Sequence, residues 1–331
     1  MLVIKDINIS YLTDFPASES WLFITPKKIF YITDSRYILE AQEGLKGIIV
    51  KQFSKSIDDT LFELAGQNKI KRIGFDERHI SHAQYKIFHQ KSPKNVQWVA
   101  ANGLIERLRE IKEKNEIGNI KEALRIHKQA LQFLKPVIKP GISEREVFYK
   151  LENFVKSRNV GFSFAPIIAS GPNSCYPHAK ITDRKIKNNE PVLVDFGIDY
   201  QGYKSDLTRM FFLGKIRPLV LDVEQHVRAA QQKAIQKIRA DVKAKEVDHQ
   251  ARNYLKEKRL AKFFGHSLGH GVGLEIHENP RLSQTSTAIL KEGMVVTVEP
   301  AVYIPHQFGI RIEDMILVKK KDCEVLSVNN D

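Results

Sequence analysis

Five side chains in the C-terminal half of the sequence have the chemistry of metal ligands. Four are carboxylates and one is an imidazole: Asp195, Asp206, His270, Glu299 and Glu313. Asp195 and Glu299 each end an apolar run typical of a strand, and Glu313 lies inside another. Carboxylates on half-buried strands are unfavourable unless they are paired or bound to a cation. Because this set is rich in hard oxygen ligands, the sequence predicts a metallohydrolase with two divalent ions.

The spacing of the acids indicates how strands would bring them together. Asp195 and Asp206 are eleven residues apart, with the turn-like residues 199–202 between them. A hairpin would place these two carboxylates on neighbouring strands. Glu299 and Glu313 are fourteen residues apart, which is also compatible with adjacent strands. Either pair alone could equally consist of turn, edge or surface acids, whereas all five ligands together favour a site.

A glycine-rich segment, residues 265–278, holds three histidines: His266, His270 and His277. Glycine permits close backbone approach, and imidazole serves both as a ligand and as a proton shuttle. Packing would explain one such histidine better than three, so we interpret the segment as part of the site. The ligand spacing is not that of the His-Glu-x-x-His zinc helix.

The loop at residues 170–179 places Cys175 close in sequence to His178. This arrangement raises the alternative of a thiol nucleophile. A small buried cysteine is the favoured interpretation, because nothing nearby indicates a lowered thiol pKa.

Composition excludes several classes of protein. The chain has 331 residues and a formal net charge of +13. Its basic residues are scattered and no nucleic-acid-binding motif accompanies them, so a solvated basic surface is favoured over a specific nucleic-acid site. No apolar run is long enough for a membrane span and no leader segment is evident. The two cysteines give no disulfide framework, which predicts a cytoplasmic protein.

Hydrophobic patterns predict a small α/β domain in the first hundred residues. A hairpin is expected at residues 21–25 and 29–33. The other expected elements are a helix at 37–43, a strand at 47–50, a helix at 57–66, a strand at 72–75 and a helix at 80–90.

The hydrophobic pattern of the sequence changes near residue 105, from alternating strands and helices to continuous helical spacing. Residues 104–134 have helical spacing, with a break between two helices expected at 115–118. Ser143 and Glu146 form a capping-box pattern that opens a helix to about residue 157. Beyond them, strands that carry the acids alternate with long helices at 220–238 and 244–259. The sequence therefore predicts two domains, 1–105 and 106–331.

Motifs that follow one another along residues 170–318 resemble those of the pita-bread metallopeptidases. They are Gly-Pro-Asn-Ser at 171–174 with Pro-His-Ala at 177–179, Val-Asp-Phe-Gly at 194–197, Ser-Asp-Leu-Thr-Arg at 205–209, Gly-His at 265–266 with His-Gly at 270–271 and His-Glu at 277–278, Val-Glu-Pro at 298–300, and Arg-Ile-Glu-Asp at 311–314. More narrowly, they resemble the Xaa-Pro aminopeptidase and Xaa-Pro dipeptidase (prolidase) branch. Tyr-Leu-Thr-Asp-Phe at 11–15 and Thr-Asp-Ser-Arg-Tyr at 33–37 resemble the creatinase-type N-terminal domain of that branch.

The resemblance implies an α/β (α+β) fold: a small creatinase-like N-terminal domain, then a pita-bread catalytic domain with a curved antiparallel sheet and flanking helices. It also implies two divalent metal ions per subunit and a homodimer. Asp195 would chelate one ion, His270 and Glu299 would hold the other, and Asp206 and Glu313 would be shared by both. Glu299 could also take a proton from the water that both ions activate and return it to the leaving nitrogen.

The remaining roles are likewise implied by the resemblance. His178 and His277 would line the substrate pocket and stabilise the tetrahedral intermediate. His266 would contact the substrate beyond the scissile bond. Tyr303 and Arg311 match positions next to the ligands and join the substrate-binding set.

The implied activity is that of an exopeptidase that cleaves the bond between an N-terminal residue and a following proline, using a hydroxide that bridges the two ions. Manganese is the expected metal, although cobalt, zinc or iron could accept the same ligands. The substrate could be a dipeptide or a longer peptide with proline in second position.

Three other functions remain as alternatives. One is a catalytically inactive pita-bread module that binds protein or peptide, and the complete ligand set disfavours it. Another is a creatinase-like amidinohydrolase, which would not need all five ligands. A methionine aminopeptidase fits less well, because the additional N-terminal domain matches the proline-specific branch.

Overall fold

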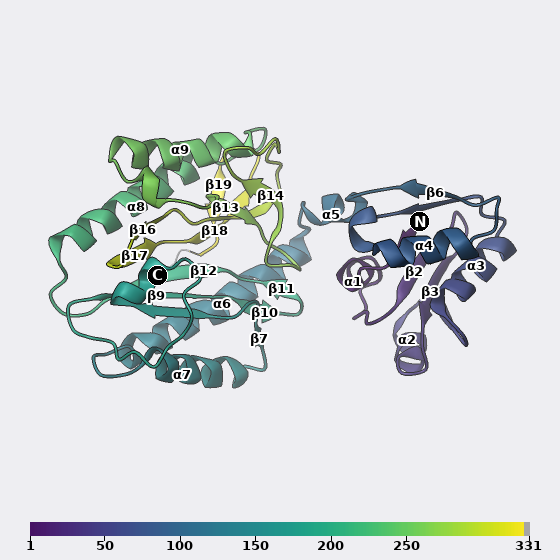
Figure 1. The fold of residues 1–331 in the computed structure, drawn as a ribbon, viewed down its shortest axis with the longest axis horizontal. Coiled ribbons are helices and arrows are strands. Elements are labelled where there is room, and N and C mark those ends of the chain that lie inside the picture. The colour runs from purple at the N-terminus through teal and green to yellow at the C-terminus, as the bar shows by residue number, and fades with distance from the viewer. Residues whose placement is uncertain (328–331) are drawn as a thin grey trace. The chain divides into compact units, whose positions relative to one another are not determined.

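The computed structural model describes residues 1–327 of the chain. The chain divides into two compact units, Met1–Arg109 and Glu110–Asp331 (Figure 1). Each unit has hydrophobic cores of its own, as expected of independently organised domains. None of the described helices is both long and apolar enough to cross a bilayer.

The N-terminal unit is built on a four-stranded sheet in the order β1-β2-β3-β4. The first three strands are antiparallel, whereas β3 and β4 are parallel. A separate parallel pair, β5 and β6, forms a second small sheet. The strand bounds are β1 Leu2–Val3, β2 Trp21–Ile24, β3 Ile29–Thr33, β4 Ile49–Gln52, β5 Arg72–Phe75 and β6 Gln97–Ala100.

Short helices connect these strands. They are α1 Asp6–Thr13, α2 Ile38–Gly44, α3 Ile57–Gln67, α4 His82–Lys91 and α5 Leu104–Arg109, with a 3-10 turn η1 at Glu77–His79. The predicted hairpin and the predicted order of helices and strands are confirmed, and their ends differ by at most two residues. Apolar side chains of α3 and α4 pack against the sheet, which explains why the sequence pattern was informative here.

The C-terminal unit consists of antiparallel sheets between two pairs of helices, which confirms the predicted pita-bread architecture. Its sheets have the orders β12-β9-β8, β11-β10-β7 and β14-β13-β15-β18-β19, and β16 pairs with β17. The bounds are β7 Gly161–Phe162, β8 Ile167–Ser170, β9 Pro191–Phe196, β10 Ile198–Tyr200, β11 Tyr203–Lys204, β12 Leu207–Phe212, β13 Gly269–Gly271, β14 Glu278–Leu282, β15 Val295–Val298, β16 Ala301–Ile304, β17 Phe308–Arg311, β18 Asp314–Val318 and β19 Cys323–Val325. Short 3-10 turns are η2 Gly171–Cys175 and η3 Ala261–Phe263.

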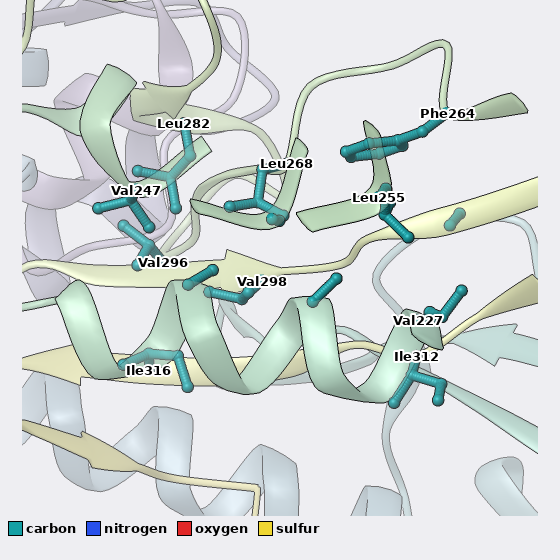
Figure 2. Packing of buried hydrophobic residues seen from close by; sticks show 14 of the residues in the cluster. Val227, Val247, Leu255, Phe264, Leu268, Leu282, Val296, Val298, Ile312 and Ile316 are labelled. Carbon is teal, nitrogen blue, oxygen red and sulfur yellow. The ribbon is translucent and has the colours of Figure 1, made fainter. Parts of the chain in front are cut away.

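Two helix pairs cover opposite sides of these sheets (Figure 1). On one side, α6 (Lys114–Val137) and α7 (Glu144–Lys156) bury apolar residues against strands β9 and β12. On the other side, α8 (Pro218–Lys237) and α9 (Ala244–Glu257) pack on β15 and β18, as Figure 2 shows. Central strands covered on both sides can bury polar side chains only where those side chains find partners. Of the candidate acids, Asp195 lies within β9, and the other three are adjacent in sequence to the ends of β12, β15 and β18.

The predicted helix break at residues 115–118 is wrong. The break lies between α5 and α6, and α6 begins at Lys114. Glu113 and Glu116 form a capping box there, in which the Glu116 carboxylate accepts the Glu113 N–H at 2.8 Å. The polar residues therefore open the helix rather than interrupt it, and Gly118 is tolerated inside it. Single-sequence patterns locate helix ends poorly, because capping depends on side-chain geometry.

The capping box at the start of α7 should contribute measurably to stability. Ser143 Oγ accepts the Glu146 N–H at 3.1 Å, and the Glu146 carboxylate accepts the Ser143 N–H at 2.7 Å. We expect Ser143→Ala to lower the free energy of unfolding by about 1 kcal/mol, because an N–H of the first turn loses its acceptor. Denaturant unfolding measures this, and Ser143→Thr, which keeps the hydroxyl, is the matched control. Equal stability of the alanine variant and the native protein would contradict the assignment.

Candidate metal centre

The first pair of predicted ligands lies on two neighbouring strands. Asp195 belongs to β9, and Asp206 directly precedes β12. These strands are antiparallel, with Thr208 opposite Asp195. The connection between them runs through the β10–β11 turn, so the expected placement of both acids on adjacent strands is confirmed.

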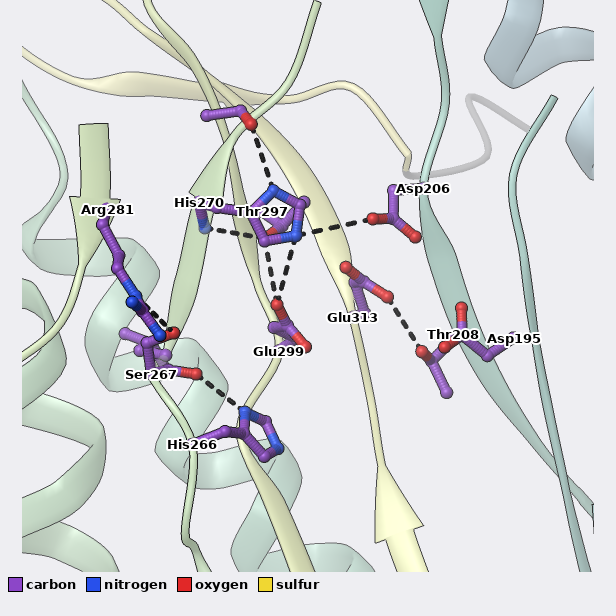
Figure 3. A network of polar contacts seen from close by, with 12 residues as sticks. Asp195, Asp206, Thr208, His266, Ser267, His270, Arg281, Thr297, Glu299 and Glu313 are labelled. Carbon is purple, nitrogen blue, oxygen red and sulfur yellow. Dashed lines mark hydrogen bonds and ion pairs between the residues drawn. The ribbon is translucent and has the colours of Figure 1, made fainter. Parts of the chain in front are cut away.

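The second pair lies on another sheet. Glu299 follows β15, Glu313 precedes β18, and these two strands pair antiparallel. His270 lies in β13, which pairs with β15 on its other side. The five side chains therefore come from two different sheets and converge between them, as Figure 3 shows.

The ligand atoms of Asp206, His270 and Glu313 lie within 4.8 Å of one another. The Nε2 atom of His270 is 3.6 Å from Asp206 Oδ2 and 3.4 Å from Glu299 Oε1. Its other ring nitrogen, Nδ1, donates to the Gly271 carbonyl at 3.0 Å. That hydrogen bond assigns the proton to Nδ1, so the Nε2 lone pair faces the acids and is available to a cation.

The electrostatics of this group favour a cation. Burial raises the pKa of Asp206 and of Glu313 well above the ordinary values, and repulsion from the neighbouring acids adds to the effect. Burial likewise raises the pKa of Glu299 to about 8. The Oδ1 atom of Asp195 is buried and has no hydrogen-bond partner among the described residues. Unmatched buried carboxylate oxygens of this kind are the donors that divalent metal ions accept, so the residues present fit a metal site.

A buried arginine lies behind the acids. Arg311 is 4% exposed and its guanidinium donates to an oxygen of Asp195. It also donates to Thr208 Oγ1 at 3.0 Å and to the Tyr303 hydroxyl at 2.5 Å. Thr208 in turn donates to Glu313 Oε2 at 2.8 Å. This chain of hydrogen bonds holds acids from the two sheets in fixed orientations, so Arg311 and Tyr303 lie beside the ligands. Their predicted contact with substrate stays a prediction.

Two of the three predicted pocket histidines are more exposed than the ligands. His178 and His277 are exposed, and the His277 ring lies 4.4 Å from that of His270. His266 is partly buried, donates from Nδ1 to the Ser267 carbonyl at 2.8 Å, and has Nε2 3.3 Å from the Tyr303 hydroxyl. Burial lowers the pKa of His266 to about 4, so this ring is neutral near pH 7. The exposed pair can reach a bound molecule, and the roles of all three remain predictions.

Sequence reasoning missed two threonines that organise the centre. Thr297 accepts the His270 backbone N–H at 3.1 Å and donates to Glu299 Oε1 at 3.4 Å. Thr208 links Arg311 to Glu313, as described above. Each threonine lies two residues from a ligand, at the spacing that places side chains on the same face of an extended chain. This spacing of two residues from a ligand is the sequence signal that could have identified both threonines.

Glu144, at the start of α7, is another residue that sequence reasoning did not identify. Its buried carboxylate accepts hydrogen bonds from the N–H and Oγ of Ser170, from Asn173 Nδ2, and from the N–H and Oγ1 of Thr182. These bonds fix the two ends of the loop that presents His178. Nothing local in the sequence indicates them, because the partners are 26 to 38 residues away.

The N-terminal unit contains a second cluster of possible ligands, Asp76, His79 and Glu106. Burial alone would raise the pKa of Glu106, but hydrogen bonds from Asn8 and His79 outweigh it and lower the pKa to about 2. Arg78 also pairs with Glu106 and with Asp76. These carboxylates are already matched by protein donors, in contrast to those of the C-terminal unit.

Removing metal should make the stability of the protein fall with rising pH. An unfolded glutamate titrates near about 4.3, whereas burial sets the pKa of Glu299 at about 8. Folding of the metal-free protein therefore takes up a proton between these values, and the associated stability is lost as the pH rises through about 8. We expect the melting temperature of chelator-treated protein to fall between about pH 6.5 and about pH 8.5.

The histidines do not obscure this pH window. Burial lowers the pKa of His270 to about 4. The stability linked to its neutral form is therefore fully present above the ordinary histidine pKa of about 6.5, and it is lost only as the pH falls towards about 4. The control is protein loaded with a divalent metal, whose melting temperature should stay nearly flat because the carboxylates remain ionised. A flat profile in verified metal-free protein would contradict the assignment.

Comparison with known proteins agrees with this geometry. Residues 118–320 match the description Metallopeptidase family M24, and residues 1–111 match the Creatinase/Prolidase N-terminal domain. The chain is 35% identical over 332 residues to an Xaa-Pro dipeptidase of Pyrococcus horikoshii, covering 99% of this chain and 92% of that protein.

Solved structures show the same relationship over nearly the full length. An Xaa-Pro dipeptidase from Bacillus anthracis superposes with a TM-score of 0.95 at 34% identity, covering 100% of this chain and 93% of that one. An X-Pro aminopeptidase from Thermotoga maritima superposes with a TM-score of 0.92 at 31% identity, covering 99% and 95%. This chain therefore belongs to metallopeptidase family M24, as a hydrolase with a creatinase/prolidase-type N-terminal domain.

Proposed function

We propose that this protein is an exopeptidase that hydrolyses the bond between an N-terminal residue and a following proline. The five converging ligands would hold two divalent metal ions, with manganese as the first candidate. The observation that carries the proposal is the group of buried, mutually repelling carboxylates around His270 Nε2. The names of the relatives, an Xaa-Pro dipeptidase and an X-Pro aminopeptidase, support the substrate class.

When bound, the two ions would supply the Lewis acidity that makes a water nucleophilic near neutral pH. Side chains of the protein would transfer the proton and stabilise the carbonyl oxygen. Glu299, whose carboxylate lies beside His270 Nε2, can accept a proton and pass it to the leaving nitrogen. His178 and His277 are exposed beside the buried acids, where they can donate hydrogen bonds to the carbonyl oxygen under attack.

Proline specificity follows from the kind of contacts that the pocket offers. The bond to proline is a tertiary amide without an N–H, and the ring fixes φ near −65°. A site that gripped an N–H at this position would lose that contact with proline. Imidazole groups beside the centre, namely those of His178, His266 and His277, need no such N–H.

A non-catalytic peptide-binding module is the second candidate. It would leave the fold intact but would not require the complete set of acids. The raised pKa values of Asp206 and Glu313 oppose it, because uncompensated buried carboxylates reduce stability unless a cation offsets them. We further propose that the protein is cytoplasmic and forms a homodimer. Cell fractionation would test the location, and light scattering would test the oligomeric state.

The substrate class can be tested with matched peptides. Metal-loaded protein should cleave Ala-Pro or Ala-Pro-Ala with a higher kcat/KM than Ala-Ala, and the comparison of the two proline peptides separates dipeptidase from aminopeptidase activity. N-acetyl-Ala-Pro should be a poor substrate if the free amine is bound in the site. Equal kcat/KM for Ala-Pro and Ala-Ala would remove proline specificity while leaving a metallopeptidase.

Two substitutions should separate ligand from pocket residue. Glu313→Gln should lower metal occupancy, because a carboxylate that faces the centre is replaced by a neutral amide. His277→Ala should keep its metal and lose kcat by about a hundredfold, because an exposed donor to the reacting carbonyl is removed. Elemental analysis and steady-state kinetics on both variants decide the assignment. Loss of metal from His277→Ala with retention in Glu313→Gln would show that the two roles are reversed.

A further inference from the structure

The buried face of helix α6 contains one polar ring, which the proposed reaction does not use. His127 has no exposed surface, and its ring lies against that of Phe196, with centroids 3.9 Å apart. Leu124 and Leu131, one turn away on either side along the helix, are also buried and apolar. A leucine at position 127 would suit such surroundings better than imidazole, because imidazole must give up its hydration on burial.

Hydrogen bonding assigns the proton of this ring to one nitrogen. His127 Nδ1 lies 3.1 Å from Ser205 Oγ. That hydroxyl already accepts the Ile198 backbone N–H at 2.9 Å, and no other described residue accepts its proton. The Ser205 hydroxyl therefore donates to Nδ1, which makes His127 the neutral tautomer with its proton on Nε2. Burial also lowers the pKa of His127, which likewise favours the neutral ring.

The Nε2–H of this tautomer has no hydrogen-bond partner among the described residues. An unpaired buried donor reduces stability. Packing and stability therefore do not account for a histidine at this position. Its one directed contact, with Ser205, is the feature that an apolar side chain could not reproduce.

Ser205 is held through each of its polar atoms. Its N–H donates to the Ile198 carbonyl at 2.9 Å, and its carbonyl accepts from Ser163 Oγ at 3.0 Å. The backbone passes so close to Gly197 that a Cβ added there would lie 2.0 Å from the Ser205 carbonyl oxygen. These adjoining antiparallel segments are tightly packed, so a shift of Ser205 would move its neighbours along the chain.

One chain neighbour of Ser205 is an aspartate of the metal centre, and a second aspartate lies next to the ring that packs on His127. Ser205 precedes Asp206 directly, and Phe196, the ring partner of His127, directly follows Asp195. The same helix face contacts this region a second time: Glu116, eleven residues before His127, accepts the Tyr203 hydroxyl at 2.9 Å. Eleven residues are about three helical turns, so both contacts come from one side of α6.

We propose that His127 is a positioning residue for the metal centre. By accepting a hydrogen bond from Ser205 and packing on Phe196, it fixes the paired strand segments that orient Asp195 and Asp206. The inference rests on the proposed metal centre and goes beyond it, because His127 contacts neither a ligand atom nor a substrate. It acts through Ser205, so its effect should appear in metal affinity before it appears in folding.

The test is calorimetric titration of Mn²⁺ into the metal-free full-length chain. His127→Leu keeps most of the volume and removes the acceptor, and we expect its Mn²⁺ affinity to fall by about tenfold. Ser205→Ala removes the other partner and should show a similar loss. The double variant should lose no more affinity than either single variant, because the two residues act as one unit.

Two control variants distinguish positioning from general destabilisation. Leu134→Ala removes a buried side chain from the same helix, two turns beyond His127, and should lower the melting temperature while leaving Mn²⁺ affinity unchanged. His127→Asn places an amide oxygen near the position of Nδ1 and should restore part of the affinity. Nitrogen NMR of ¹⁵N-histidine-labelled protein should show a buried neutral ring protonated on Nε2, which disappears in His127→Leu.

The outcomes separate this inference from the proposed function. Native protein that binds no Mn²⁺ or other divalent ion would overturn the metal centre and the inference with it. Native protein that binds Mn²⁺ while His127→Leu and Ser205→Ala bind it equally well would overturn the inference alone. An affinity loss in Leu134→Ala equal to that in His127→Leu would also overturn it, because stability rather than position would then explain the effect.

Discussion

The mutual repulsion of buried carboxylates is the constraint on which the C-terminal unit depends. Asp206 and Glu313 belong to different sheets, and both have a pKa raised first by burial and then by the neighbouring acids. Like charges in a medium of low polarity oppose folding unless protons or cations compensate them. The folded unit therefore contains a concentration of buried carboxylates whose negative charge a divalent cation can compensate.

Side chains of the protein compensate part of this negative charge. Arg311 is buried and donates to Asp195 and Thr208, and Thr208 passes a hydrogen bond to Glu313. On the opposite side His270 presents an unprotonated nitrogen to the acids. In the N-terminal unit, by contrast, Arg78 and other donors match Asp76 and Glu106. Within the described residues, Arg78 forms ion pairs with both acids of the N-terminal cluster, whereas Asp195 Oδ1 in the C-terminal cluster has no hydrogen-bond partner.

The layered fold explains how such a centre can be held rigidly. Helix pairs cover both sides of the sheets, so the strands that carry the acids are buried and their registers are fixed by packing. Polar contacts then fix local positions: Glu144 binds the loop that presents His178, and His127 binds Ser205 beside Asp206. His178 and His277 are exposed, and the ring of His277 contacts that of the buried-site residue His270.

The pita-bread class of fold was implied by the resemblance of the motifs. The sequence by itself predicted a small N-terminal α/β domain, most of the helices and strands of that domain, and the candidate ligands. These depend on hydrophobic period, turn residues and side-chain chemistry, all of which are local. Only the tertiary structure decided the start of α6, the hydrogen bonds of Arg311 and Thr208, and the contact of His127 with Ser205. The helix end depended on capping geometry. The bonds of Ser205 with His127, of Thr208 with Glu313 and of Arg311 with Asp195 join residues that are 78, 105 and 116 positions apart. Pairings over such distances follow from strand register and packing, which one sequence does not encode in any local pattern.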